Sequence, residues 1–409
     1  MKRLIIGILL VAASAPLNAK DNDWPKVSED CKQVFSPETG DSATPMQPLW
    51  KRTIACGTDF FTARPVHLAV KSIVPGGGFG PGLTFHEDFN SDKWQKKLES
   101  TSVASFQAFW STENRFRATH DKFGKRNSAR DRFALDVYAN ARGLPRLDFY
   151  GIGPKTLKSN VVIFRERDVI AGVDIFNPVA SWLALGGQIE SIWPNVGGAS
   201  ATGVPSITSA FNEGTAPGLS SQPNYIHYEG YLEPRPKFYR VPFDYKIGYA
   251  FYQDTDTGHF SFRRFRVDGN HIWHPFNRQE DVFTVHGRLT ISDTSAGHAV
   301  PFYLEETLGG SNIDGEPTLR GFPDYRFRAP DLLLIQADYD HRFWGPLGGL
   351  VFYDTGEVTT QVSDFSLAQM RHSFGFGVSL WAGNRSWFKI YVGLGSGEVV
   401  HPYFGIPKL

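Results

Sequence analysis

The sequence predicts an all-β fold, a transmembrane antiparallel β-barrel of sixteen strands. Three observations lead to this prediction. Apolar and polar residues alternate in several segments of about ten residues. Glycine and proline are frequent, at 41 and 26 of 409 residues, as a chain with many turns requires. The third observation is an export signal that no membrane-spanning apolar helix follows.

Residues 1–19 are predicted to be a signal peptide that the mature protein lacks. Lys2 and Arg3 form a basic region, an apolar stretch covers 4–13, and Leu17-Asn18-Ala19 supplies a cleavage site. After it, no run of about 18 apolar residues occurs, which excludes a helical membrane protein. An exported chain of this kind is soluble in the periplasm, secreted, or a barrel.

Residues 20–62 are expected to form a short periplasmic tail. The segment is polar and irregular, and it contains both cysteines of the chain, Cys31 and Cys56. Because the periplasm is oxidising, we expect a disulfide between them, with two unlinked thiols in a mobile tail as the alternative. Two thiols alone supply too few ligands for a metal site.

Residues 63–409 are expected to form the barrel. In 371–381, Phe374, Phe376 and Val378 alternate with serine and glycine, and 387–395 repeats this period. A soluble sandwich also alternates, but glycine, lysine and tyrosine opposite an unbroken apolar face favour a wet lumen. At about 20 residues per strand with its turn, the segment holds sixteen or seventeen strands, and bacterial barrels favour even numbers. The aperiodic stretch 195–224 is expected to be a long outward loop.

One stretch carries a longer motif. Leu308-Gly309-Gly310-Ser311 leads through Asp314-Gly315 to Arg320-Gly321-Phe322, and the strands that follow contain Asp338 and Phe352-Tyr353-Asp354. This arrangement resembles the C-terminal barrel of the BamA/TamA-type outer-membrane assembly superfamily, also called the bacterial surface antigen family. The resemblance is strongest over residues 308–404.

The resemblance implies a loop that folds back into the lumen, with Arg320 paired to acidic residues of two strands. Asp354 matches the aspartate of a Phe-x-Asp motif that begins at Phe352. Asp338 matches the acidic position of the preceding strand, where the family often has glutamate. Both aspartates lie on the polar side of their strands, and a guanidinium can bond two carboxylates at once. The alternative is an ordinary polar lumen with no specific set of partners.

The resemblance also implies a function at the bacterial outer membrane, the insertion or translocation of proteins. Outer-membrane lipid would surround the barrel, and outer-membrane or secreted proteins would be its clients. The tail is too short for the periplasmic peptide-binding repeats of many family members, so a separate periplasmic partner is a further expectation. A passive solute pore or structural barrel is the alternative. An outer-membrane barrel enzyme is less expected, because no Ser/His or Asp/His spacing supports catalysis.

Other motifs favour structural roles. The glycine-rich stretch 75–82 lacks the following helix that a phosphate site needs. Asp254 and its neighbours lack the remaining ligands of a calcium loop, and His271 and His274 have no evident third metal ligand. We therefore expect no metal and no cofactor. The formal net charge of zero provides no basic surface for nucleic acid.

Overall fold

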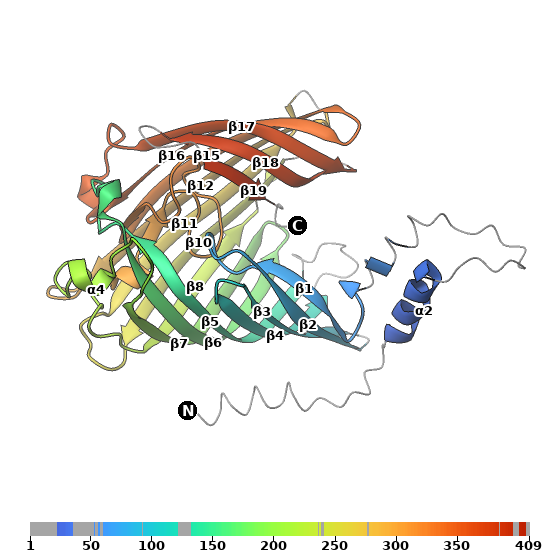
Figure 1. The fold of residues 1–409 in the computed structure, drawn as a ribbon, viewed down its shortest axis with the longest axis horizontal. Coiled ribbons are helices and arrows are strands. Elements are labelled where there is room, and N and C mark those ends of the chain that lie inside the picture. Colours follow the sequence, from blue (N-terminus) through green and yellow to red (C-terminus); the bar gives the residue numbers. More distant parts are fainter. Residues whose placement is uncertain are drawn as a thin grey trace, which may run out of the picture.

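Sixteen antiparallel strands, each paired with the one before it, form one curved sheet in the computed structural model (Figure 1). The sheet contains a seventeenth strand, β9, a two-residue segment that pairs with the start of β10. The strands are β1 (Val66–Ser72), β2 (Phe79–Asn90), β3 (Trp94–Ala104), β4 (Trp110–Asp121), β5 (Arg132–Phe149), β6 (Val162–Ala180), β7 (Leu183–Gly198), β8 (Tyr225–Pro234), β9 (Lys237–Phe238), β10 (Val241–Asp254), β11 (Phe262–Trp273), β12 (Asp281–Thr294), β15 (Asp331–Trp344), β16 (Leu347–Thr359), β17 (Arg371–Ala382), β18 (Arg385–Gly395) and β19 (His401–Gly405).

The structure describes residues 23–35, 53, 56–57, 60–91, 93–121, 132–235, 237–238, 241–275, 278–383, 385–395 and 401–405. The predicted signal peptide lies outside this range. The boundaries of the tail and the barrel stay predictions.

The alternation predicted from the sequence appears as two faces of the sheet. In β17, Phe374, Phe376 and Val378 are 59%, 60% and 51% exposed, whereas Ser373 and Ser379 are fully buried. A strand rotates successive side chains to opposite faces, so every second residue points away from the lumen. An outer apolar face and a polar inner face are what a barrel in lipid requires.

The two ends of the barrel differ. We call the end that carries the start of β1 and the helix α2 (Trp24–Phe35) the near end (Figure 1). The opposite end, which carries the short helix α4 (Ile207–Ala210), is the far end. The longest connections, 199–224 between β7 and β8 and 295–330 between β12 and β15, both lie at the far end.

An apolar core fills the far end of the lumen. Phe149 and Phe302 are fully buried there with their ring centroids 5.1 Å apart. Ile207, Ala216 and Leu219 join the same cluster, so the stretch expected to be an outward loop instead packs partly inward. Phe149 of β5 and Phe302 of the connection before β13 supply the apolar contacts against which residues 207–219 pack.

The tail is attached to the first strand. The Trp24 indole donates to the carbonyl of Val66, at 2.9 Å, and a disulfide joins Cys31 of α2 to Cys56. No helix in the described part of the chain is long and apolar enough to cross a membrane.

Candidate functional site in the lumen

The central feature of the lumen is a loop, residues 309–326, which we call the plug loop. It leaves and returns through a two-stranded ribbon, β13 (Glu306–Leu308) paired with β14 (Phe327–Ala329). The Thr318 hydroxyl donates to the Gly309 carbonyl at 2.8 Å and closes the base of the loop. Gly309 has a φ of 128°, a conformation that side-chain-bearing residues avoid.

Arg320, two residues beyond Thr318 in the plug loop, is held by two strands. Its Nε and Nη2 donate to Asp354 of β16, at 2.8 and 2.6 Å, and Nη2 also donates to Asp338 of β15 at 2.6 Å. The backbone amide of Arg320 donates to Asp354 as well, at 3.0 Å. The structure thus brings together the arginine and both aspartates that the sequence singled out.

We call Arg320 with Asp338 and Asp354 the Arg320 clamp, and its Arg320–Asp354 side is almost dry. Arg320 is 5% exposed and Asp354 is 0% exposed. The guanidinium lies over the ring of Phe352, with Cζ 3.8 Å from the ring centroid. Burial alone would lower the pKa of Arg320, but attraction to Asp338 and Asp354 raises it above the ordinary value, so the group stays charged.

The next two residues of the motif rest against neighbouring surfaces. Gly321 has a φ of 99°, and a Cβ placed on it would lie 2.6 Å from the backbone nitrogen of Gly395 in β18. A Cβ on Gly393 would lie 2.6 Å from the backbone nitrogen of Gly321. The loop can therefore touch β18 only because all three positions are glycine. Phe322 is 1% exposed and packs in an apolar cluster with Leu334.

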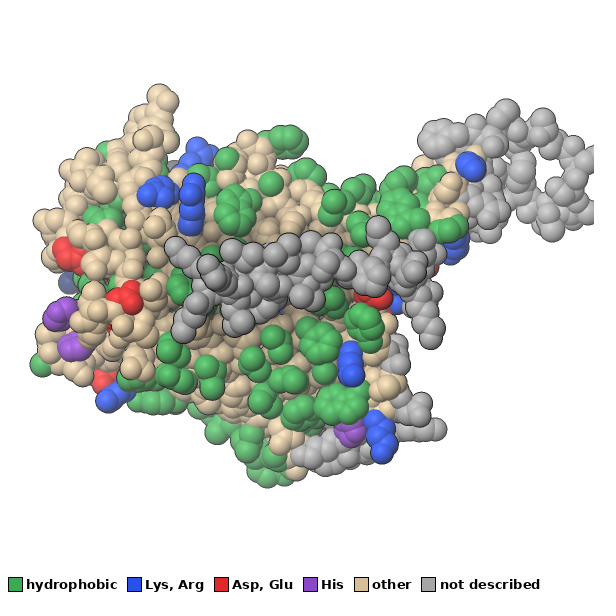
Figure 2. Space-filling view, turned by 90° about the horizontal axis from the view of Figure 1, so that it is seen from below, with side chains coloured by type: hydrophobic (Ala, Val, Ile, Leu, Met, Phe, Trp, Pro, Cys, Tyr) green, Lys and Arg blue, Asp and Glu red, His purple; other side chains and the backbone are tan. Residues whose placement is uncertain are grey.

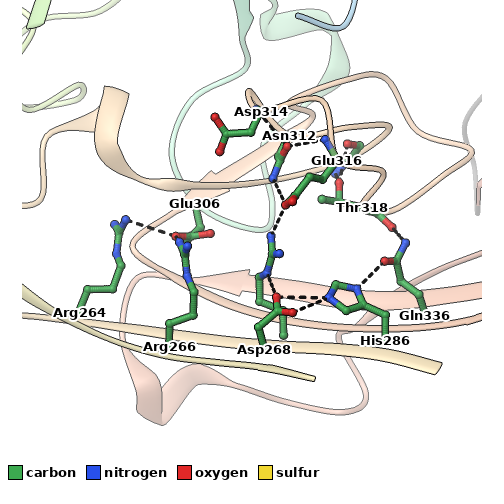
Figure 3. A network of polar contacts seen from close by, with 12 residues as sticks. Arg264, Arg266, Asp268, His286, Glu306, Asn312, Asp314, Glu316, Thr318 and Gln336 are labelled. Atoms are coloured by element: carbon green, nitrogen blue, oxygen red, sulfur yellow. Dashed lines mark hydrogen bonds and ion pairs between the residues drawn. The ribbon is translucent and has the colours of Figure 1, made fainter. Parts of the chain in front are cut away.

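A second set of contacts holds the plug loop from its other side (Figure 3). Glu316 accepts a hydrogen bond from Arg288 of β12 at 3.0 Å, and Arg288 donates to Asp268 of β11 at 2.6 Å. His286 lies 3.2 Å from Asp268 and 2.9 Å from Gln336 of β15.

Gln336 links this set to the clamp. Its side-chain amide donates to the Thr318 carbonyl at 2.6 Å and lies 3.4 Å from Asp354. The polar side chains therefore form a continuous chain across the lumen face of β11, β12, β15 and β16.

The base of the ribbon carries another ion pair. Glu306 of β13 lies 2.6 Å from Arg266 and 3.3 Å from Arg264, both on β11 (Figure 3). Burial would raise the pKa of Glu306, but the attraction of these arginines lowers it below the ordinary value, so its carboxylate stays ionised.

The loop between β5 and β6, on the opposite side of the lumen, also holds the plug loop and the ribbon. Arg326 donates to the hydroxyl and the carbonyl of Thr156, in the loop between β5 and β6, at 3.0 and 2.9 Å. Gly153 of that loop donates its amide to the Arg328 carbonyl at 2.7 Å. The segment 309–328 is therefore anchored on opposite sides of the barrel.

Sequence reasoning missed the partners of Glu316. A signal was present, since Asp268, His286 and Arg288 share the lumen-facing parity of their strands. Nothing in the plug loop's own sequence pairs Glu316 with Arg288, because the two residues meet only once the loop has folded inward.

The motifs expected to be structural lie in ordinary surroundings. Asp254 accepts backbone amides from Asp256 and Thr257, at 2.9 and 2.8 Å, as a residue that caps its own turn does. Within the described ranges, no group of three or more His, Cys, Asp or Glu side chains is placed to hold a metal ion.

Comparison with solved structures agrees with this architecture. BamA from Haemophilus ducreyi, in a crystal structure lacking POTRA domains 1–3, is similar with a TM-score of 0.53 and 10% identity, over 92% of this chain and 80% of that one. CdiB from Escherichia coli is similar with a TM-score of 0.51 and 11% identity, over 84% of this chain and 62% of CdiB. No protein-family model and no curated protein sequence matches the chain. The chain has the fold of a BamA-type outer-membrane β-barrel.

Proposed function

We propose that this protein resides in the bacterial outer membrane and inserts or translocates other proteins there. The observation that carries the proposal is the Arg320 clamp, which fixes a folded loop inside the lumen of a BamA-type barrel. A barrel that only spans the membrane needs no such loop. The clamp joins the loop to β15 and β16, and Gly321 touches β18, next to the last strand.

The ends of the sheet support this proposal. The first strand, β1, has 7 residues and the last, β19, has 5, whereas β5 and β6 have 18 and 19. Among the residues that the structure describes, β1 and β19 do not pair with each other. Pro402 in β19 has no amide hydrogen to donate. Such an edge can template the strand of an incoming protein.

The lumen argues against a passive solute pore. Its near half contains a polar cavity of about 480 Å³, lined in part by Asp174, Tyr231 and Lys246. Its far half contains the plug loop and the apolar core, beside a pocket of about 770 Å³ between the β5–β6 and β16–β17 connections. A polar vestibule that is narrowed by a folded plug suits a client that leaves through the wall better than a solute that crosses the barrel.

The proposal is tested with purified protein in liposomes of bacterial lipid. A small outer-membrane barrel is added unfolded from urea, and its folding is followed by faster migration in unheated gels. We expect the protein to accelerate folding several-fold over empty liposomes, and Arg320→Ala to lose most of this gain.

The outcome that contradicts the proposal is an unchanged client folding rate together with a steady, large conductance in planar bilayers. Recovery of the protein from the soluble periplasm would contradict the location. Crosslinking through residues 23–35 in cells would identify the separate periplasmic partner that we propose.

A further inference from the structure

The outer surface of β6 near the far end carries two arginines. Phe164, Glu166 and Asp168 are 0%, 4% and 6% exposed and face the lumen. Side chains alternate along a strand, so Arg165 and Arg167 point outward from the barrel wall.

A third arginine lies beside them on β5. The pairing of β5 with β6 shifts register between Leu144, opposite Glu166, and Leu147, opposite Phe164. This irregularity places Arg146 across from Arg165, and Arg146 is exposed. We call Arg146, Arg165 and Arg167 the far-rim arginines.

The cross-strand partners of Arg165 and Arg167 carry no charge. Arg167 pairs with Gly143 on one side and Asn195 on the other, and Arg165 pairs with Gly197. A Cβ on Gly197 would lie 3.0 Å from Nη2 of Arg165, so the guanidinium lies over this glycine.

Their hydrogen bonds go to neutral amides. Arg146 donates to the side-chain oxygen of Gln107 at 2.8 Å, and Arg165 donates to that of Asn195 at 3.3 Å. No ion pair among the described residues involves a far-rim arginine. The carboxylate of Asp148 attracts Arg146 without reaching ion-pair distance, and it offsets part of the charge of the three arginines.

The far-rim arginines lie just beyond the apolar belt. Further down the same face of β6, Val173 and Ile175 are 37% and 45% exposed. Trp193 of β7 stands opposite Val169, two residues below Arg167. Tryptophan marks the level where hydrocarbon meets headgroups. Figure 2 shows hydrophobic side chains over the middle of one outer face and charged ones toward its two ends.

We propose that the far-rim arginines bind the phosphate groups of an anionic glycolipid of the outer leaflet, the diphosphorylated lipid A of lipopolysaccharide. The inference rests on the proposed outer-membrane location, because the tail then places the near end in the periplasm and the far end outside. Guanidinium groups bind phosphate with two parallel hydrogen bonds, and three of them at headgroup level offer a fixed site. Lipid anchored here would fix the height of β5, β6 and β7 in the membrane.

The test uses the full-length mature protein in detergent, with diphosphorylated lipid A as the probe and native mass spectrometry as the readout. We expect the wild type to bind lipid A and Arg165→Ala/Arg167→Ala to bind about tenfold more weakly. Binding should also weaken as salt is raised, because exposed charges are screened. Each variant is first checked for the folded, faster-migrating form in unheated gels.

Arg263→Ala is the matched control. Arg263 is also an outward arginine at the far end, flanked by the buried Phe262 and Arg264, but it lies 3.9 Å from Asp293. We expect this variant to bind lipid A as the wild type does. An equal loss in the control would overturn the proposal, and so would wild-type protein that binds dephosphorylated lipid A equally well.

The source of the phosphate is tested separately. Inorganic phosphate that displaces lipid A at equal concentration would show a simple anion site, which also overturns the proposal. Because the readout is lipid bound to purified protein, failure of the client-folding assay leaves this test unaffected. Recovery of the protein outside the outer membrane would instead remove the location on which the inference rests.

Discussion

Arg320 bridges two strands, so its removal leaves two carboxylates without their partner. Asp354 is fully buried, and breaking a buried pair costs about 3 to 5 kcal/mol when one charge is left uncompensated. Asp338 is 28% exposed at its side chain, so water recovers part of this loss. We expect Arg320→Ala to leave a folded barrel whose plug loop is cut faster by protease. Arg320→Lys should behave the same way, because an ammonium cannot replace a planar fork.

A double-mutant cycle measures the contact itself. Arg320→Ala and Asp354→Ala should couple by about 1 to 3 kcal/mol in the free energy of unfolding, because two hydrogen bonds join their side chains. Strictly additive losses, with an unchanged protease pattern, would show that the two side chains do not meet in solution.

The glycines of β18 give a second residue-scale prediction. Gly393→Ala places a methyl group against the backbone of Gly321, where no flexible side chain can move aside. We expect the tip of the plug loop to lift from β18 and its amide protons to exchange faster. Gly287→Ala in β12 is the control, because its nearest neighbour would be 4.0 Å away. Equal protection in both variants would contradict the contact.

At the scale of the element, the plug loop depends on pH through Asp324. Burial raises the pKa of Asp324 to about 6, although the Ser311 amide donates to it and opposes the shift. An unfolded aspartate has a pKa of about 3.9, so the folded loop binds the proton more tightly. The contribution of protonated Asp324 to the stability of the folded loop is therefore complete below about pH 4 and is lost as the pH rises through 6.

We therefore expect the amide protons of the plug loop to show higher protection factors, corrected for the intrinsic pH dependence of exchange, at pH 5 than at pH 7. Asp324→Asn should remove this difference in protection, because an amide side chain does not titrate but still accepts the Ser311 amide. A pH dependence that persists in Asp324→Asn would assign the effect to another group.

At the scale of the whole molecule, the plug loop and the apolar core occupy much of the far half of the barrel. We expect wild-type protein in planar bilayers to conduct little. Replacing residues 309–326 by a short glycine linker should open a steady conductance, because the clamp and its partners then leave the lumen. A wild-type conductance as large as that of the deletion would show that the plug does not seal the barrel.

The sequence predicted what depends on local periodicity. Alternation placed Asp338 and Asp354 on the lumen side, and the resemblance to the BamA/TamA-type family implied Arg320 as their partner. It did not predict the inward packing of Ile207, since that contact depends on Phe149 and Phe302, which join it from distant parts of the chain. The pairing of Glu316 with Arg288 could not be predicted for a similar reason, because an aperiodic loop gives no information about which strand residues it will contact.

The contact between Gly321 and β18 has a mechanical consequence. The plug loop grips β15 and β16 through Arg320, while its tip rests on the strand that holds the short β19. A force that withdraws the loop therefore also acts on β18 and on the C-terminal edge of the sheet. We therefore expect withdrawal of the plug loop and loosening of the C-terminal edge of the sheet to be coupled.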